Sequence, residues 1–230
     1  MAIEGMNFSV GKSEFVAILG PSGCGKSSLL NLIAGLETPT SGTLMVHDKP
    51  ISGVDSSRFL ISQQACLFPW LTIAQNVEFG PKMQGMPEIE RRKAAREMLE
   101  AVGLSEWGAS FPHQLSGGMK QRAAVARALV NHPEFLLMDE PFAALDYPSR
   151  MGMQDFITQI RDHFQPTILF VTHMPEEAIA LADRILTLSS RPAKIISEIS
   201  IPLSFPRVNT DASFVEFLNL IHRSLPKYQP

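Results

Sequence analysis

A glycine-rich segment near the N-terminus constrains the fold more than any other feature of the chain. Residues 20–27 read Gly-Pro-Ser-Gly-Cys-Gly-Lys-Ser, and a short strand pattern, Glu14–Leu19, precedes them. The pattern of Lys26–Ala34 is typical of a helix, and Gly35 is suited to end it. This order of strand, glycine loop and helix is the one that a phosphate-binding loop requires. A random chain of this length matches the loop pattern about one time in a hundred.

The residue types of this loop indicate how it would hold phosphate. Its glycines let backbone N–H groups point inward at phosphate oxygens, and the following helix adds the positive end of its dipole. We expect Lys26 to reach the β- and γ-phosphates of a nucleotide and the Ser27 hydroxyl to bind Mg²⁺. The predicted nucleotide contacts in this region are Gly20, Pro21, Ser22, Gly23, Cys24, Gly25, Lys26, Ser27 and Ser28.

Two carboxylates follow a second strand pattern. Phe135–Met138 is continuously apolar, as expected for a strand buried on both faces of a parallel sheet, and Asp139 and Glu140 come directly after it. Ligands of open α/β sheets gather at the carboxyl ends of strands. Asp139 is therefore predicted to hold Mg²⁺, directly or through water, and Glu140 to act as general base toward an attacking water. Adjacent acids at a strand end can also be merely solvated, but the phosphate loop upstream favours the chemical roles.

The rest of the chain alternates strand and helix patterns, which predicts a mostly parallel sheet wrapped by helices. From about residue 72 to 131 the pattern becomes helical, as expected for an inserted block, and Glu88–Val102 within it is amphipathic with a charged face. The other expected strands are Thr43–Val46, Thr167–Val171, Arg184–Leu188 and Lys194–Ile201, and the other expected helices are Gly118–Val130, Met151–Phe164, Pro175–Ala182 and Asp211–Leu225.

Length and charge narrow the class of protein. A chain of 230 residues suits one large α/β domain. Its formal net charge of −3 argues against a nucleic-acid binder, which usually carries a basic excess. No apolar run approaches the roughly 18 residues that span a bilayer, and the N-terminus lacks a signal-peptide pattern. Cys24 and Cys66 have no metal-ligand spacing, so we expect a reduced, cytoplasmic chain that reaches a membrane only through a partner.

A third motif points to a family. Residues 115–122 read Leu-Ser-Gly-Gly-Met-Lys-Gln-Arg and resemble the signature motif of ABC ATPases. Small residues at a helix start offer N–H groups and a positive dipole to an anion. The motif lies between the phosphate loop and Asp139, in the order that this family shows, and the resemblance extends from about Ala2 to Pro206. It implies further nucleotide contacts at Ser116, Gly117, Gly118 and Gln121.

The resemblance assigns roles to three more segments. Gln63 is similar to the Q-loop glutamine that contacts Mg²⁺ and the lytic water, with Gln64 as a competing assignment. The segment Ala144–Asp146 resembles the D-loop at the dimer contact. His173 resembles the switch histidine that contacts the γ-phosphate, although a histidine after a strand can simply be a surface residue. The implied catalytic residues are Glu140, His173 and Gln63, and the implied metal ligands are Ser27, Gln63 and Asp139.

The resemblance also implies a fold and a mechanism. The fold would be a P-loop NTPase of ABC type, with a mostly parallel central sheet wrapped by helices, an inserted α-helical subdomain and a small antiparallel β part. One domain would span residues 1–230, with a RecA-like core at about 1–71 and 132–206, the helical subdomain at about 72–131 and a C-terminal helix at about 211–225. Family members are Mg²⁺-dependent ATPases. They form head-to-tail dimers that clamp ATP between the phosphate loop of one subunit and the signature motif of the other.

The segment Leu67–Thr72 resembles the Q-loop sequence of importer subunits in the nitrate, sulfonate and taurine group, and Arg191–Ile195 fits the C-terminal end of that group. Membership implies a transmembrane permease as partner, contacted near Gln63–Trp70 and the helical subdomain. It also implies indirect dependence on a solute-binding protein, no nucleic acid, and a cytoplasmic location, peripheral on the inner face of the cell membrane.

The chain departs from the family pattern at its N-terminus. Family members begin with a further strand that carries an aromatic residue stacked on the adenine. Here Ala2–Val10 is similar to the segment after that aromatic, and we interpret Phe8 as sheet core. The adenine stack is therefore expected to be missing, at a loss of about 1–3 kcal/mol by analogy with base–aromatic stacking.

Two other functions compete with an importer ATPase. The first is an ATP-binding module with weak or no turnover, a consequence of the missing adenine-stacking strand. The second is a nucleic-acid-associated ABC ATPase. Proteins of that kind carry long coiled coils or two tandem ATPase domains, whereas this chain has one set of motifs and no heptad pattern. The hydrolytic residues are all present, so we favour the importer ATPase.

Overall fold

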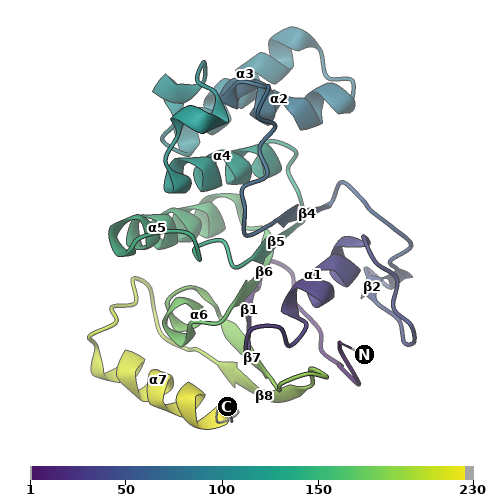
Figure 1. Cartoon of the computed structure of the whole chain (residues 1–230), viewed down its shortest axis with the longest axis vertical. Coiled ribbons are helices and arrows are strands. Elements are labelled where there is room, and N and C mark those ends of the chain that lie inside the picture. Colours follow the sequence, from purple (N-terminus) through teal and green to yellow (C-terminus); the bar gives the residue numbers. More distant parts are fainter. Residues whose placement is uncertain (1, 226–230) are drawn as a thin grey trace.

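A six-stranded sheet forms the centre of the computed structural model, which describes residues 2–225. The strand order is β4-β5-β6-β1-β7-β8, and all neighbours are parallel except β7 and β8 (Figure 1). The five parallel strands carry their carboxyl ends to one edge of the sheet. Their bounds are β1 (Phe15–Leu19), β4 (Arg58–Ile61), β5 (Phe135–Asp139), β6 (Thr167–Thr172) and β7 (Arg184–Leu188), with β8 at Ile195–Ser200.

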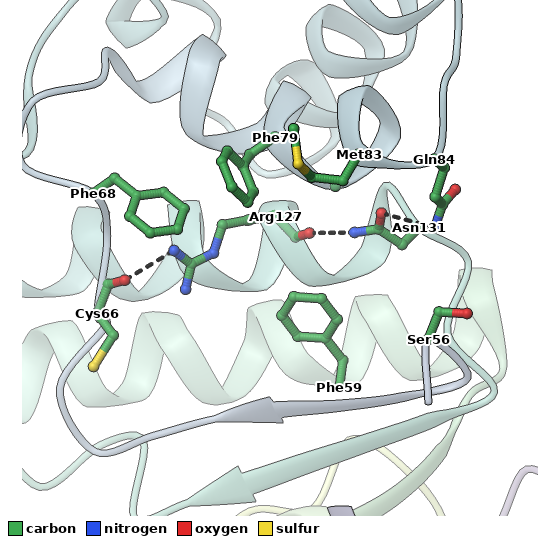
Figure 2. Close-up of a pocket in the computed structure, with 10 residues that line it drawn as sticks. Ser56, Phe59, Cys66, Phe68, Phe79, Met83, Gln84, Arg127 and Asn131 are labelled. Carbon is green, nitrogen blue, oxygen red and sulfur yellow. Dashed lines mark hydrogen bonds between the residues drawn. The ribbon is translucent and has the colours of Figure 1, made fainter. Parts of the chain in front are cut away.

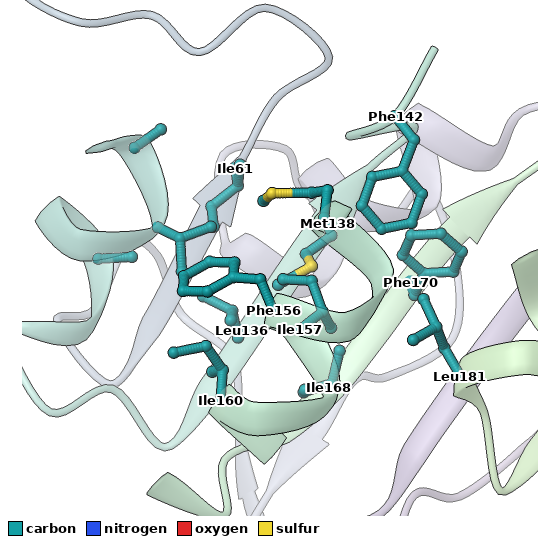
Figure 3. Packing of buried hydrophobic residues seen from close by; sticks show 14 of the residues in the cluster. Ile61, Leu136, Met138, Phe142, Phe156, Ile157, Ile160, Ile168, Phe170 and Leu181 are labelled. Carbon is teal, nitrogen blue, oxygen red and sulfur yellow. The ribbon is translucent and has the colours of Figure 1, made fainter. Parts of the chain in front are cut away.

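Helices cover both faces of this sheet, because successive residues of a strand point to opposite sides. Helix α1 (Lys26–Ala34) lies on one side, with α5 (Tyr147–Phe164) and α6 (Pro175–Leu181) on the other (Figure 1). Alternate residues of β5 thus enter different clusters, Leu137 on the α1 side and Leu136 on the α5 side. Figure 3 shows the cluster on the α5 side of the sheet, in which side chains of α5 pack over those of β5 and β6. Its labelled members include Leu136, Met138, Phe156, Ile157, Ile160, Ile168 and Phe170.

A block of helices stands at the β4 end of the sheet, at the top of Figure 1. It contains α2 (Ile73–Met83), α3 (Glu88–Ala101) and α4 (Gly117–Leu129), and the short 3₁₀ turns Ser105–Trp107 and Pro112–Gln114 lie between α3 and α4. Helix α2 begins after Thr72, whose hydroxyl accepts from the Gln75 N–H while the Gln75 side chain accepts from the Thr72 N–H. Such a reciprocal cap fixes the start of a helix. Over the described residues, no helix has the length and apolarity to cross a bilayer.

Two smaller parts complete the fold. Strands β2 (Met45–Val46) and β3 (Lys49–Pro50) form an antiparallel pair outside the main sheet. Helix α7 (Ala212–Ser224) packs near α6 and buries Phe214 and Ile221. The predicted fold class, a mostly parallel sheet wrapped by helices with a helical block and a small antiparallel part, is confirmed.

Several local features differ from the sequence predictions. The strand predicted at Thr43–Val46 is shorter, and strands β3 and β4 were not predicted. Helix α5 begins at Tyr147 rather than Met151, because the Asp146 side chain caps it by accepting from the Ser149 N–H at 3.0 Å. Phe8 lies outside every described strand and is only partly buried against the α1-side cluster, so its interpretation as sheet core is wrong.

Candidate functional site

The phosphate loop joins β1 to α1 through backbone conformations that favour glycine. Gly23 and Gly25 have φ values of 76° and 126°, and Gly25 is the N-cap of α1. A Cβ added at Gly25 would lie 3.0 Å from the Ala2 carbonyl oxygen, so the N-terminal segment also leaves no room there. These constraints hold the first N–H groups of α1 beside the end of β1. Within the loop Ser22, Gly23 and Ser27 are exposed, Pro21, Gly25 and Ser28 are partly buried, and Gly20, Cys24 and Lys26 are buried.

Lys26 is the buried cation of this region, with only 4% of its surface exposed. Its Nζ donates to the carbonyl oxygens of Gly20 and Pro21 at 2.9 and 3.0 Å. The same atom lies 3.5 Å from Oε1 of Glu140. The lysine therefore lies over the loop, with its charge balanced by the carboxylate that follows β5.

Asp139 ends β5 and faces the start of α1, where it is hydrogen-bonded to Ser27. Burial raises the pKa of Asp139, the hydrogen bond from Ser27 opposes this shift, the neighbouring Glu140 charge adds to it, and Lys26 also opposes it. A serine hydroxyl beside a carboxylate is the hard oxygen pair that Mg²⁺ accepts, with the remaining positions filled by water or phosphate. Two of the three residues predicted to bind the metal, Ser27 and Asp139, are thus brought together.

Glu140 adopts a left-handed backbone conformation, with a φ of 44°, that is uncommon for a residue with a side chain. Its N–H donates to the Val171 carbonyl at 2.9 Å, which ties the turn after β5 to β6. The turn directs the carboxylate between two basic side chains. Lys26 Nζ lies 3.5 Å from Oε1, and His173 Nδ1 lies 2.9 Å from Oε2. His173 is 46% exposed and Glu140 is 20% exposed, so the histidine lies on the solvent side.

The amides near this cluster are placed differently. Gln63 and Gln64 are both exposed, and the backbone carbonyl of Gln63 accepts from Nε2 of Gln121 at 3.3 Å. Gln121 is buried, and the same nitrogen donates to the Pro141 carbonyl at 2.9 Å. Gln121 therefore joins the Gln63 segment to the residue after Glu140, and lies in the interior rather than at the exposed start of α4.

The Ser-Gly-Gly segment lies at the start of α4 and apart from the phosphate loop. Ser116 is the N-cap, its hydroxyl accepts from the Met119 N–H at 3.4 Å, and both Ser116 and Gly117 are exposed. A Cβ on Gly117 would lie 3.5 Å from Cδ2 of Leu145, so the segment neighbours Ala144–Asp146. Within residues 2–225, no hydrogen bond or ion pair joins Ser116–Gly118 to the phosphate loop.

Three residues that the sequence analysis missed support the His173 segment. The Thr172 hydroxyl donates to Oε2 of Glu177 at 2.6 Å, and Arg150 Nε lies 3.6 Å from Oε1 of the same carboxylate. Burial raises the pKa of Glu177, and Thr172 and Arg150 oppose that shift. Glu177 follows Glu176 at a helix start, where acids are usually solvated. No local pattern in the sequence predicts the contact between Thr172 and Glu177.

A separate pocket of about 500 Å³ lies between the sheet edge and the helical block (Figure 2). Arg127 crosses it, with Nη1 donating to the Cys66 carbonyl at 2.8 Å and its guanidinium 5.4 Å from the Phe68 ring centroid. Phe68 in turn packs against Phe79, and Trp70 beside it is 71% exposed. An aromatic-lined hollow with an exposed tryptophan at its border is suited to receive another protein. The remaining lining residues include Ser56, Phe59, Met83, Gln84 and Asn131.

Comparisons with known proteins agree with this geometry. Residues 3–143 match the model of the family described as ABC transporter. The nitrate import ATP-binding protein NrtD of Synechocystis sp. is 47% identical over 203 residues, which are 88% of this chain and 76% of that protein. The taurine import ATP-binding protein TauB of Pelagibacter ubique is 41% identical over 210 residues, 91% of this chain and 79% of that protein.

Solved structures show the same likeness. A dimeric ATP-binding cassette in a post-hydrolysis state, bound to ADP and Pi, superposes with a TM-score of 0.76 at 31% identity. The match covers 88% of this chain and 92% of that one. The two chains therefore share their fold over most of their length.

Proposed function

Because the chain belongs to the ABC transporter family of ATP-binding proteins, we propose that it is the ATP-hydrolysing subunit of an ABC importer. The observation that carries this proposal is the bridge that Glu140 makes between Lys26 and His173. Phosphoryl transfer to water needs a cation at the phosphates, a base near the water and a group that orients the base. The three side chains supply these parts within one cluster of paired charges.

In the proposed reaction Lys26, Glu140 and His173 have different tasks. Lys26 would exchange its present carbonyl partners for the β- and γ-phosphate oxygens of ATP. Glu140 would then be released from Lys26 to accept a proton from the attacking water, while His173 holds the other carboxylate oxygen and reaches the γ-phosphate. Ser27 and Asp139 would hold Mg²⁺, with Gln63 as a further ligand. The bound metal would neutralise charge on the phosphates.

The site is proposed to be completed by a second copy of the chain. The start of α4 presents the N–H groups of an exposed Ser-Gly-Gly segment, which suit an anion, yet no phosphate-binding group of the same described chain meets them. A head-to-tail dimer would bring Ser116–Gly118 of one copy over the phosphate loop of the other. The dimeric cassette that this chain resembles supports this arrangement.

The permease contact is proposed at the aromatic pocket of Figure 2. The pocket adjoins the predicted contact segment Gln63–Trp70, and its floor and wall come from α2 and α4 of the helical block. The importer names of the nitrate and taurine relatives support transport of nitrate, sulfonate, taurine or a similar small solute. The chain would then work at the inner face of the cell membrane, with the solute selected by a separate binding protein.

ATP hydrolysis by the purified chain tests this function. We expect it to release phosphate from ATP when Mg²⁺ is supplied and to stop when EDTA removes the metal. Co-expression with its transmembrane permease partner should raise the rate and retain both proteins in one complex. A chain that binds ATP but releases no phosphate, alone or with its permease, would contradict the proposal.

A further inference from the structure

A buried ion pair joins the starts of α5 and α6, outside the nucleotide motifs. Arg150 Nε lies 3.6 Å from Oε1 of Glu177, whose exposed fraction is only 4%. A buried carboxylate is costly unless charge and hydrogen bonds compensate it. Neither residue contacts Lys26 or Glu140 by a hydrogen bond or ion pair in the described structure. The reaction outlined above leaves this pair without a task.

The carboxylate end of the pair holds the backbone on both sides of His173. Thr172 donates its hydroxyl to Oε2 of Glu177 at 2.6 Å. The same hydroxyl oxygen accepts from the Met174 N–H at 3.1 Å. The residues before and after His173 are therefore fixed through one side chain that Glu177 orients.

The guanidinium end reaches the segment that neighbours the Ser-Gly-Gly start of α4. Arg150 Nη2 donates to the Leu145 carbonyl at 3.2 Å, and Nη1 lies 3.2 Å from Sδ of Met174. Leu145 is the residue whose side chain lies nearest to Gly117. A planar guanidinium can hold several partners in one fixed geometry, which a lysine ammonium cannot. Arg150 therefore spans from the Ala144–Asp146 segment to the residue after His173.

We propose that Arg150 and Glu177 are positioning residues that couple the Ala144–Asp146 segment to His173. A second copy packing on that segment would fix the position of the Leu145 carbonyl. Through Arg150 and Glu177, this contact would in turn fix the orientation of His173 toward Glu140. This inference rests on the proposed function, because it needs the dimer and the hydrolytic role of Glu140. It adds a reason for hydrolysis to follow dimer closure.

The competing explanation is that the pair only fastens α5 to α6. A fastening role lowers the unfolding temperature, while the turnover of each folded molecule stays the same. A positioning role lowers kcat and leaves the KM for ATP nearly unchanged, because neither side chain is placed to touch the nucleotide. Measuring kcat and KM separately, each beside the unfolding temperature, therefore distinguishes the explanations.

The experiment compares Arg150→Met, Glu177→Gln and Glu177→Ala in the full-length chain, with kcat, KM and unfolding temperature measured for each. We expect kcat to fall about tenfold to a hundredfold in Arg150→Met and Glu177→Ala, since small misplacements of reacting groups cost rates of this order. Glu177→Gln keeps the acceptor for Thr172 and should recover part of the loss. KM should change by less than about threefold. Arg150→Met combined with Glu177→Ala should be no slower than the slower single variant, because both act through one network.

Arg161→Met is the matched control. Arg161 lies on the same helix, is 20% exposed against 22% for Arg150, and pairs at 3.5 Å with Asp183 just after α6. Its loss should lower the unfolding temperature and leave kcat at the wild-type value. If Arg150→Met does not fold, Glu177→Gln carries the test, because it preserves the side-chain volume and the Thr172 contact.

Two results would overturn the inference. One is wild-type kcat in folded Glu177→Ala or Arg150→Met, and the other is a raised KM with unchanged kcat. A wild-type chain without any ATPase activity would instead remove the proposed function, and this inference with it. An active wild type with unaffected variants removes this inference alone.

Discussion

Two regions of the molecule present groups suited to an anion, and they differ in how far one chain satisfies them. At the phosphate loop, Lys26 is buried and contacts two carbonyls and a carboxylate of its own chain. At the start of α4, Ser116 and Gly117 are exposed, and the Ser116 hydroxyl accepts from the Met119 N–H of its own helix turn. The lysine of the first region is enclosed by its own fold, whereas Ser116 and Gly117 of the second face outward. This contrast supports the proposal that the second region serves a partner rather than its own chain.

The difference follows from where each region lies in the fold. The phosphate loop sits where the parallel strands end, so β5 and β6 supply a carboxylate and a histidine from segments distant in sequence. The α4 start follows a surface turn in the helical block and lies beside the Ala144–Asp146 segment and Ser149. Enclosed groups should therefore govern the chemical step, and outward-facing groups should govern assembly. Substitutions in each region can separate an effect on chemistry from an effect on assembly.

Glu140→Gln should have the largest effect. It removes the base and one partner each of Lys26 and His173 while keeping the side-chain volume, so we expect turnover to fall about a thousandfold. ATP binding measured by calorimetry should persist. Phosphate release under excess ATP gives the rate, with Glu134→Gln, a partly buried acid paired to the exposed His47, as the control that keeps wild-type turnover. Near-normal hydrolysis in Glu140→Gln would show that the enclosed cluster does not carry the chemistry.

Ser116→Arg should have the next largest effect. The added side chain would block the outward-facing helix start, so we expect turnover to fall about a hundredfold. ATP binding to the isolated chain should be unchanged, because the phosphate loop of the same chain is untouched. Ser105→Arg, at another exposed serine of the helical block, should retain turnover. Weakened ATP binding by monomeric Ser116→Arg would argue that both regions act within one chain.

The smallest effect is expected in the pH dependence of the unfolding free energy, through the buried carboxyl group of Glu177. Burial raises the pKa of Glu177 above its ordinary 4.5, so the folded state holds that proton more tightly than the unfolded state. The wild type therefore loses stability as pH rises from near 4.5 to the folded pKa, and Glu177→Gln does not. The unfolding free energy of the variant relative to wild type should thus increase with pH across this window. Urea denaturation at several pH values measures it, and a difference that shrinks with rising pH would contradict the assignment.

The sequence predicted regular features well because their signals are local. The bounds of α1 were predicted as Lys26–Ala34 and are observed so, since the loop and Gly35 mark both ends. Strand β4 was missed because its four residues, between polar turns, are too short for a periodic signal. Its pairing with β5, a contact distant in sequence, makes it a strand.

The candidate site shows the same limit. Motif order predicted that Lys26, Asp139, Glu140 and His173 would meet, because parallel strands end at one edge of the sheet. The role of Gln121 was assigned from its place in the motif, whereas its side chain is buried between two backbone carbonyls. The contacts of Arg150, Thr172 and Glu177 depend on how α5 and α6 pack, and no local pattern encodes that packing.

If each hydrolytic site draws on two copies of the chain, mixing two inactive variants should restore activity. Glu140→Gln keeps an intact Ser-Gly-Gly segment, and Ser116→Arg keeps an intact enclosed cluster. Mixed in equal amounts before ATP is added, they should recover about one quarter of wild-type turnover, since half of randomly paired dimers combine both variants and each such dimer holds one intact site. Each variant alone at the same total concentration should stay inactive. A mixture no more active than the two variants separately would contradict the shared site.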